Sequence, residues 1–372
     1  MKYPILLMAR ELHLGGSERQ MTEIALGLDS TRFEPYVGTF RPQGLRGDQL
    51  RAAGVPVIQF PVYSFRSRAA LAGIWQLARY IRRQKIRLVH SFDAPLTVYS
   101  MPVARYVTSA RLVSSQRGHR GLTPEFRKLL RWTDHLVNGI VVNCKYLENH
   151  LVQDESVPQE LIHICYNGID LHQFFWDHSP RPPSLPEDAL VIGVVCALRP
   201  EKGLATLVSA FARVRSLCKQ MKLAIVGSGT MLAELQQQAK EAGVFSDCVW
   251  EPTTADVARW LRAFDIFVLP SLDEALSNSL MEAMACRCPV VASNVGGNPE
   301  LVAHTERGLL FEAQNVGALT EALRRLIEDT DLRRKLAEAG ERFIRGGFSR
   351  KASASRMAEI YEQLLASRPQ IR

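Results

Sequence analysis

The stretch FDIFVLPSLDEALSNSLMEAMACRCPVVAS, residues 264–293, joins two apolar runs through a segment with a helical pattern. Apart from Asp265 and Ser293, the runs 264–270 and 289–293 are apolar and do not alternate with polar residues, which is typical of strands in a parallel sheet that is covered on both faces. Ser277 is suited to cap a helix that begins at Asn278. Because a helix that connects two parallel strands makes a βαβ unit, this stretch predicts a parallel α/β sheet.

The same alternation continues on both sides of this stretch. A segment rich in Pro and Ser at 178–189 interrupts it, as a linker between domains does. The expected strands are 3–9, 36–40, 55–60, 86–91, 110–116, 139–144 and 161–167 before the break, and 190–197, 221–227, 248–252, 264–270, 289–293 and 308–312 after it. The expected helices include 17–28, 69–84, 124–136, 203–218, 230–242, 255–263 and 278–286. Two such series predict two doubly wound domains, 1–178 and 190–347, with 179–189 as the linker.

The composition indicates an ordinary globular protein. Of 372 residues, 47% are hydrophobic and 23% are charged, which does not suggest disorder. The seven cysteines are scattered without a CxxC pair, so neither a zinc site nor a disulfide framework is supported. The apolar run before Arg10 is too short for a signal peptide, and no stretch has the roughly 18 apolar residues of a membrane span. We therefore expect a cytoplasmic protein with reduced thiols.

The net charge of +8 is concentrated in the first half of the chain. Residues 1–180 contain 22 Lys and Arg against 15 Asp and Glu, whereas residues 181–372 contain 24 against 23. This asymmetry suggests that the first half meets an anionic partner. Nucleic acid, an anionic membrane surface and a phosphorylated substrate are all compatible with it.

Three turns that follow expected strands are candidates for phosphate binding. In HLGGSERQM, 13–21, Gly15 and Gly16 allow the backbone to approach a ligand closely, and Ser17 could cap the next helix. A tight turn with an N-cap and no ligand would have the same pattern. In ALRPEKG, Arg199 and Lys202 could meet a diphosphate or could be ordinary surface charges. In VGSG, 226–229, a glycine turn that includes Gly227 opens a helix after an apolar strand.

Two glutamates follow the strand at 264–270. Glu274 lies in the turn and Glu282 in the early part of the next helix, so the N–H groups of about 275–279 point toward the same site. Carboxylates in these positions can accept hydrogen bonds from the hydroxyls of a sugar and a ribose. The alternative is a turn residue and an exposed helix residue without a function.

In order and spacing, these motifs resemble the retaining glycosyltransferases of family 4 (glycosyl transferases group 1). The resemblance covers nearly the whole chain and is carried by GGSE at 15–18, YNGID at 166–170, RPEKG at 199–203, VGSG at 226–229, EAMACRCPVVAS at 282–293 and VGGNPELV at 295–302. It implies the α/β fold called GT-B, which has two facing Rossmann-like doubly wound domains with a deep interdomain cleft. It also implies that a final helix in 348–372 returns to the first domain.

The resemblance assigns roles to individual residues. Glu274 would bind hydroxyls of the donor sugar and Glu282 the nucleotide ribose. Arg199 and Lys202 would hold the donor diphosphate and stabilise the leaving group, so that Lys202, Arg199 and Glu274 form the catalytic set. The implied donor-binding residues are Gly15, Gly16, Gly227, Ala275, Leu276, Ser277, Asn278 and Glu282.

The reaction implied is transfer of a sugar from a nucleotide-diphosphate sugar, UDP first and GDP next, to a glycan or lipid-linked acceptor. Such a reaction fits bacterial surface polysaccharide or glycoconjugate synthesis. It needs no metal or other cofactor, because cations and helix N-termini neutralise the phosphates. A nucleotide-sugar epimerase, a sugar phosphorylase and a non-catalytic sugar-nucleotide-binding protein are the alternatives, and no motif supports nucleic-acid binding.

The sequence departs from the family pattern at three places. Many relatives have an arginine at the position of Ala197, a role that Arg199 could take. Relatives often have a histidine where this chain has Arg117, and either Arg117 or His119 could line the sugar site. The usual EGFPN is EALSN here, which reshapes the loop without removing its N–H groups.

Two basic amphipathic segments, 65–87 and 123–137, lie in the first half of the chain. Their mixture of aromatic, aliphatic and basic residues is typical of helices that lie on anionic lipid. The same mixture is found on solvated helices that cover a core. We expect peripheral contact with the inner face of a membrane through this half.

Overall fold

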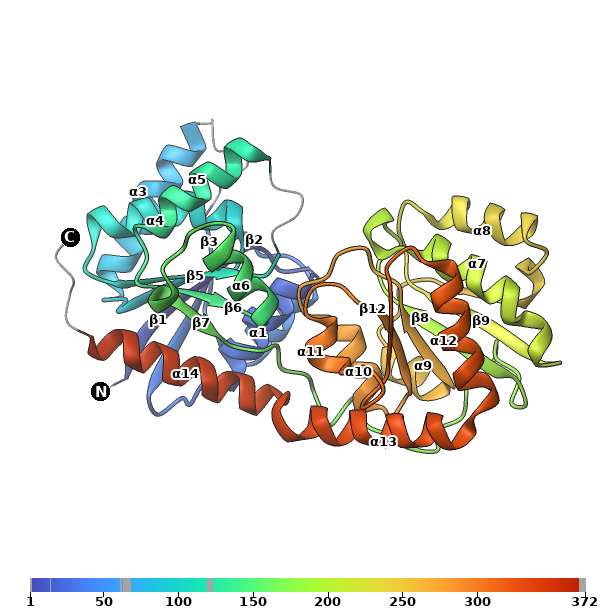
Figure 1. The fold of residues 1–372 in the computed structure, drawn as a ribbon. Coiled ribbons are helices and arrows are strands. Elements are labelled where there is room, and N and C mark those ends of the chain that lie inside the picture. The colour runs from blue at the N-terminus through green and yellow to red at the C-terminus, as the bar shows by residue number, and fades with distance from the viewer. Residues whose placement is uncertain (1, 14, 61, 63–67, 119–122, 368–372) are drawn as a thin grey trace. The chain divides into compact units, whose positions relative to one another are not determined.

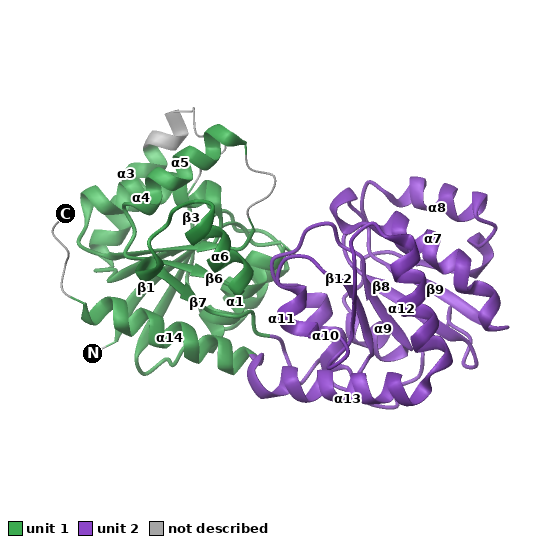
Figure 2. Ribbon diagram, in the orientation of Figure 1, with its two compact units in different colours: residues 1–168, 350–372 green, residues 169–349 purple. Residues whose placement is uncertain are grey.

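The computed structural model describes residues 2–13, 15–60, 62, 68–118 and 123–367. The chain divides into two compact units (Figure 2). Unit 1 comprises Met1–Gly168 and Arg350–Arg372, and unit 2 comprises Ile169–Ser349. The sequence had placed the linker at 179–189, whereas this division falls between Gly168 and Ile169.

Unit 1 contains a seven-stranded parallel sheet with strand order β3-β2-β1-β4-β5-β6-β7 (Figure 1). Its strands are β1 (Tyr3–Glu11), β2 (Phe33–Arg41), β3 (Val57–Gln59), β4 (Leu88–Ser91), β5 (Arg111–Gln116), β6 (Gly139–Val142) and β7 (Ile162–Ile164). Its helices are α1 (Gly16–Gly27), α2 (Leu45–Ala52), α3 (Arg68–Arg83), α4 (Ala94–Val107), α5 (Pro124–Asp134), α6 (Lys145–Gln153), the short η1 (Gln159–Leu161) and α14 (Arg350–Ala366).

Unit 2 contains a six-stranded parallel sheet with strand order β10-β9-β8-β11-β12-β13. Its strands are β8 (Leu190–Val195), β9 (Met221–Val226), β10 (Cys248–Glu251), β11 (Ile266–Leu269), β12 (Val290–Ser293) and β13 (Leu309–Phe311). Its helices are α7 (Leu204–Val214), α8 (Leu232–Glu241), α9 (Val257–Ala263), α10 (Asn278–Ala285), α11 (Asn298–Val302), α12 (Val316–Glu328) and α13 (Thr330–Gly347), with the short turns η2 (Pro200–Lys202), η3 (Arg215–Leu217) and η4 (Phe245–Asp247).

Each sheet has a switch point, where the strand order reverses direction. In unit 1 it lies between β1 and β4, and in unit 2 between β8 and β11. Loops that leave two such strands diverge to opposite faces of the sheet, so a crevice forms at their carboxyl ends, and ligands of doubly wound folds bind there. The turns after β8 and β11 are therefore the first place to look for a site in unit 2.

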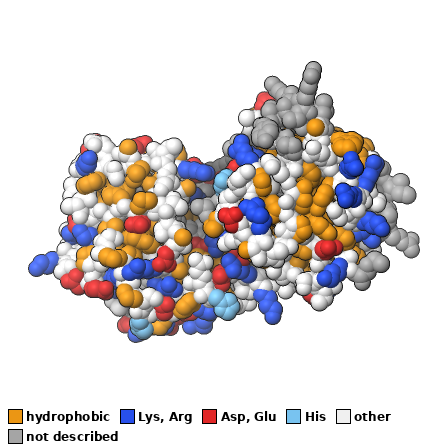
Figure 3. Space-filling view, turned by 180° about the vertical axis from the view of Figure 1, so that it is seen from behind, with side chains coloured by type: hydrophobic (Ala, Val, Ile, Leu, Met, Phe, Trp, Pro, Cys, Tyr) orange, Lys and Arg blue, Asp and Glu red, His pale blue; other side chains and the backbone are white. Residues whose placement is uncertain are grey.

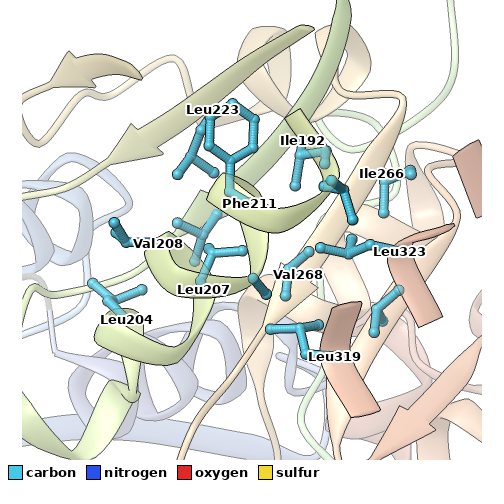
Figure 4. Close-up of a cluster of buried hydrophobic side chains, with 14 of the residues drawn as sticks. Ile192, Leu204, Leu207, Val208, Phe211, Leu223, Ile266, Val268, Leu319 and Leu323 are labelled. Atoms are coloured by element: carbon cyan, nitrogen blue, oxygen red, sulfur yellow. The ribbon is translucent and has the colours of Figure 1, made fainter. Parts of the chain in front are cut away.

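The core of unit 2 shows why the sheet and its helices form together. Phe211 and Leu207 of α7 and Leu323 of α12 pack with Ile192 of β8 and Val268 of β11, and all five are buried (Figure 4). The strands are apolar on both faces because helices cover each side of a parallel sheet. This packing supports the strand ends from which the candidate site extends.

The predicted strands are confirmed, each within a few residues of its expected limits. The sequence patterns did not predict helices α2, α4, α6, α11, α12 and α13. Helix α14 packs on α1 in unit 1 (Figure 1). Within the described ranges, no helix is long and apolar enough to cross a membrane.

Candidate active site

The turn after β8 lies directly against the end of β11. Gly203 follows η2 with a φ of 61°, and a Cβ atom there would be 2.2 Å from the carbonyl oxygen of Pro270. Only glycine fits this left-handed position with so little space. The backbone N–H of Leu272 also donates to the carbonyl oxygen of Glu201 at 2.8 Å. These contacts hold Lys202 next to the turn that carries Glu274.

Lys202 and Glu274 form a half-buried ion pair at the switch point. The Nζ atom of Lys202 lies 2.7 Å from Oε2 of Glu274, and the Ser271 hydroxyl donates to the same oxygen at 3.1 Å. Burial opposes the charge of Lys202, but the Glu274 carboxylate outweighs it, so the net effect raises the pKa of Lys202. The ammonium group is therefore charged at neutral pH.

The loop that carries Glu274 is braced from the β12 side. The Ser293 hydroxyl at the end of β12 donates to the carbonyl oxygen of Ser271 at 2.6 Å. Gly296 has a φ of 54°, and a Cβ atom there would lie 1.5 Å from the carbonyl oxygen of Glu274. These supports were missed by the sequence analysis, although Gly296 lies in the quoted VGGN motif. Its positive φ could not be inferred from the motif alone.

The predicted N-terminus of α10 is confirmed. Ser277 is the N-cap, and its hydroxyl accepts a hydrogen bond from the N–H of Leu280 at 3.3 Å, with Asn278 as the first helical residue. Ala275 precedes the cap, and its carbonyl oxygen accepts from the N–H of Gly297 at 2.7 Å. The positive end of the helix thus begins three residues after Glu274.

Glu282 and Leu276 are both buried, each with 4% of its surface exposed. The reading of Glu282 as an exposed helix residue is therefore wrong. Burial of a carboxylate is costly unless polar groups compensate for it. The family resemblance assigns it to a ribose, and that role stays a prediction.

The glycine turn after β9 packs backbone to backbone on the turn after β8. A Cβ atom at Gly227, whose φ is 147°, would lie 1.9 Å from the carbonyl oxygen of Cys196, and one at Gly229 would lie 2.3 Å from that of Leu198. The N–H of Leu198 donates to the carbonyl oxygen of Ser228 at 3.0 Å. The close contact between the two turns is thus sufficient to explain why glycine occupies both positions, because a larger side chain would clash there. Contact of Gly227 with a nucleotide remains a prediction.

Arg199 differs from Lys202 in its exposure. Its side chain is 66% exposed, and the nearest carboxylate oxygen of Glu201 lies 3.9 Å from its Nη1 atom. Arg199 borders a pocket of about 400 Å³ in unit 2, together with Leu272 and Gln314. Its guanidinium group is therefore accessible to a ligand.

The remaining candidates lie in unit 1. Gly15 is the N-cap of α1 and Gly16 is its first residue, in the connection that follows β1. The prediction that Ser17 caps this helix is wrong. Because Gly15 already has the extended backbone of an N-cap and the helix starts at Gly16, Ser17 falls inside the first turn, and no side-chain cap bond forms.

Arg117 follows β5 and contacts the YNGID segment. Its Nη1 atom donates to Oδ1 of Asn167 at 2.6 Å, and its guanidinium carbon lies 5.4 Å from the centre of the Phe92 ring. Burial lowers the pKa of Arg117 to about 10, so the group keeps its charge at neutral pH. His119 lies outside the described residues.

The site in unit 2 combines a cation, a carboxylate and a helix N-terminus. Such a set can hold a phosphate group and a hydroxylated ligand next to each other. In the part of the chain that the structure describes, no three His, Cys, Asp or Glu side chains gather in a way that could hold a metal ion. Lys202 thus contacts Glu274, and Ser277 caps the helix that follows the Glu274 loop, while Ser271, Ser293 and Gly296 are added by the structure.

Two glycosyltransferase family models match successive parts of the chain. The family model described as "Glycosyltransferase Family 4" matches residues 14–173, and the one described as "Glycosyl transferases group 1" matches residues 177–343. The chain is 29% identical over 285 residues to a GDP-mannose-dependent alpha-(1-6)-phosphatidylinositol monomannoside mannosyltransferase of Mycolicibacterium smegmatis, covering 72% of this chain and 74% of that protein. It is 30% identical over 241 residues to a D-inositol 3-phosphate glycosyltransferase of Corynebacterium jeikeium, covering 60% and 57%.

Two solved structures share the fold. A glycosyltransferase from Rickettsia africae has a TM-score of 0.86 at 19% identity, over 99% of this chain and 100% of that one. Anabaena Alr3699/HepE, solved in complex with UDP, has a TM-score of 0.84 at 21% identity, over 98% and 100%.

Proposed function

Because the chain belongs to glycosyltransferase family 4 and has the GT-B fold, we propose that it moves a sugar from a nucleoside diphosphate donor to a glycan or lipid-linked acceptor, with retention of configuration at the anomeric carbon. The ion pair between Lys202 and Glu274, beside the N-terminus of α10, carries this proposal. It lies at the switch point, where a doubly wound fold binds its ligand.

In this proposal, Lys202 stabilises the departing diphosphate. When the bond between the anomeric carbon and the phosphate oxygen breaks, negative charge develops on that oxygen. The ammonium group of Lys202, the accessible guanidinium of Arg199 and the N–H groups at Ser277 and Asn278 would stabilise it. Glu274 balances Lys202 before the donor arrives and would then accept hydrogen bonds from the sugar hydroxyls.

Attack on the same face of the sugar accounts for retention. The acceptor hydroxyl would approach from the side of the leaving group, and the departing phosphate would take its proton. The positive groups above make a metal ion unnecessary in this proposal. Activity that is unchanged after EDTA treatment is expected, and activity that returns only with a divalent cation would contradict this part.

The donor base requires a direct test. The sequence put UDP-sugars first, the mycobacterial relative is named for GDP-mannose, and an Anabaena structure contains UDP-glucose. A thermal-shift panel with UDP, GDP, ADP and their common sugar conjugates would separate these. A ligand at about 100 times its dissociation constant stabilises the folded state by about 2.7 kcal/mol.

Lys202→Ala should abolish this ligand-dependent shift. Lys222→Ala is the matched control, because Lys222 also forms a half-buried ion pair in unit 2, with Asp247 at 3.2 Å. A shift that survives in Lys202→Ala, or the absence of a shift with every nucleotide, would contradict the proposal. Turnover of a nucleotide sugar without any acceptor would instead indicate an epimerase.

We also propose that unit 1 contacts an anionic membrane, where a lipid-linked acceptor for surface glycoconjugates would lie. Helix α4 contacts both α3 and α5, and these three helices carry exposed aromatic residues, with Trp75 61%, Tyr106 75% and Trp132 47% exposed. The Arg79 guanidinium lies 5.2 Å from the centre of the Trp75 ring. Aromatic rings with basic neighbours suit a lipid interface.

Vesicle flotation tests this contact. Trp75→Ala should reduce binding to anionic vesicles at low salt. Trp176→Ala should not, although Trp176 is an exposed tryptophan of unit 2 that packs on Arg287 at 5.3 Å in the same manner. On the face shown in Figure 3, basic side chains lie among hydrophobic ones. Neither substitution changes the net charge, so a difference between the variants reports on the aromatic ring. Equal loss in both variants would contradict the assignment.

A further inference from the structure

A second pocket in unit 1 lies at the amino-terminal ends of the strands. Arg87 directly precedes β4, Arg111 is the first residue of β5, and Asn138 directly precedes β6. The N–H of Arg111 donates to the carbonyl oxygen of Arg87 at 2.8 Å, so these strand ends are neighbours. Together with the end of α4, they line a pocket of about 340 Å³. It is at the opposite edge of the sheet from Gly15 and Gly16.

Three arginines meet at this pocket, which we name the tri-arginine pocket. Arg105 in the last turn of α4 joins Arg87 and Arg111 in its lining. Several other arginines of unit 1 have carboxylate partners, for example Arg131 with Asp134 at 2.9 Å. Among the residues that the structure describes, Arg87, Arg105 and Arg111 have no such partner.

The charges of the three arginines affect one another. Burial, together with the positive charges of Arg105 and Arg87, lowers the pKa of Arg111. Like charges that gather without a counter-charge have this effect, whereas a paired arginine is shifted the other way. Arg111 also donates to the carbonyl oxygen of Ser367 at the end of α14, so its side chain is held at the pocket.

The other polar groups of the pocket add hydrogen-bond donors. Oδ1 of Asn138 accepts from the N–H of Leu112 at 2.9 Å, which orients the amide and leaves its Nδ2 atom as a donor. The exposed hydroxyl of Ser109 is a further donor in the lining. Thr108 is satisfied, because its hydroxyl donates to the carbonyl oxygen of Ala104 at 2.9 Å. The lining is thus rich in donors and lacks acidic side chains.

We propose that the tri-arginine pocket binds a phosphate group, either of a free phosphate compound or of a lipid headgroup. The planar forks of arginine match the oxygens of a phosphate and can bind it in bidentate fashion. The pocket is larger than one phosphate, and Leu365 and Ala110 give part of its wall an apolar character, so the ligand carries further atoms. Ligands of doubly wound folds bind at the carboxyl ends of strands, so this site is separate from sugar transfer and does not rest on it.

The first arm of the test uses inorganic pyrophosphate and the full chain. Calorimetric titration should show binding that Arg87→Gln with Arg105→Gln weakens about tenfold or more, because charge-assisted hydrogen bonds are lost. This double variant keeps the bond between Arg111 and Ser367, so we expect it to fold, and its melting temperature checks this. The control is Arg213→Gln with Arg342→Gln, which removes two exposed arginines from unit 2.

Pyrophosphate is also suited to the candidate donor site, so Lys202→Ala is measured in parallel. Binding that persists in Lys202→Ala and is lost in the Arg87 and Arg105 variant supports the tri-arginine pocket. Binding that is lost only in Lys202→Ala belongs to the donor site and overturns the proposal as far as free phosphate is concerned. The proposal for the tri-arginine pocket and the proposal for the donor site can therefore be contradicted independently of each other.

The second arm uses vesicles of phosphatidylcholine that contain phosphatidic acid. A loss of flotation in the Arg87 and Arg105 variant, compared with the control pair, identifies the headgroup as the source of the phosphate. A loss in the pyrophosphate arm alone identifies a free phosphate compound. If the variant and its control behave alike in both arms, or if the unaltered protein binds neither probe, the proposal is overturned.

Discussion

Lys202 follows β8 and Glu274 follows β11, and the contact between their side chains depends on neighbouring residues that carry no charge. Gly203 allows the turn after β8 to approach Pro270, and Ser271 donates to the same oxygen of Glu274 that meets Lys202. A charged pair of this kind must be held in place before the substrate arrives if it is to stabilise a developing charge.

We predict that Lys202→Met lowers kcat by about 100- to 1000-fold, because the departing diphosphate loses its half-buried cation. Steady-state kinetics with the donor found in the thermal-shift panel measures this effect. Lys222→Met removes an ion pair of similar exposure from unit 2, and its kcat should stay close to that of the unaltered protein. Equal losses in the two variants would point to a general effect on stability instead.

The ion pair should also make stability depend on alkaline pH. The folded-state pKa of Lys202 lies above its ordinary value of 10.5, so the stabilisation is fully present below 10.5 and is lost as the pH rises through the folded-state pKa. Urea unfolding at pH 8, 10 and 11 measures it. The difference in free energy of unfolding between the unaltered protein and Lys202→Met should shrink over this range. A constant difference would show that the pair does not contribute through its charge.

Gly296→Ala tests the support of the Glu274 loop. A Cβ atom would overlap the carbonyl oxygen of Glu274, so we expect a loss of stability and of activity. Gly243→Ala is the control, because Gly243 also has a positive φ, of 70°, but has no atom within 4 Å of the added carbon. The control should cost about 1 kcal/mol for the left-handed backbone, and Gly296→Ala about 2 kcal/mol more. Equal costs, measured by urea unfolding, would mean that the loop adjusts freely.

At the scale of elements, α10 and its cap provide the positive helix end of the site. Ser277→Ala should cost about 1 kcal/mol through the lost cap and weaken donor binding. Asn315→Ala removes a cap from α12, where Oδ1 of Asn315 accepts from Ala318 at 2.9 Å, and should cost as much without affecting the donor. Ser277→Asp should keep the cap but repel the phosphates, so stability is retained while binding falls about tenfold. Unchanged donor binding in Ser277→Asp would show that the N-terminus of α10 does not contact the donor phosphates.

The strands could be predicted because continuous apolar runs between turn residues leave few alternatives. The start of α10 was also predicted, since Ser277 and Asn278 follow a strand directly. The start of α1 was missed at Ser17, because the two preceding glycines fit an N-cap equally well. Supports such as Ser293 and Gly296 could not be predicted, since their partners at Ser271 and Glu274 lie on a neighbouring loop whose approach is set by tertiary packing.

At the scale of the whole molecule, unit 1 is built from two separate parts of the chain. Met357, Ile360 and Tyr361 of α14 are buried in the core of unit 1, together with Phe33 of β2. The Tyr361 hydroxyl lies 2.7 Å from Nδ1 of His90 on β4, and Nε2 of His90 lies 2.9 Å from the hydroxyl of Ser115. Helix α14 thus completes both the apolar core and a buried polar chain of unit 1.

A chain that ends at Ser349 should keep unit 2 folded and destabilise unit 1. Removal of α14 uncovers apolar side chains and leaves His90 without its tyrosine partner, whereas the core of unit 2 contains no residue after 349. Hydrogen exchange resolved by peptide measures protection in each unit separately. Fast exchange in β1 and β4 with slow exchange in β8 and β11 is the expected result. Equal protection of both sheets would contradict the role assigned to α14.

The late position of α14 has a consequence for biosynthesis. The ribosome produces the seven strands of unit 1 first, but the helix that closes their core emerges only after all of unit 2. At common translation rates, residues 169–366 take about 10 to 40 s to make. During this time unit 2 can fold on the nascent chain, while unit 1 still exposes the apolar surface that α14 will cover. A chaperone that binds this nascent chain would therefore remain longest on the unit that was made first.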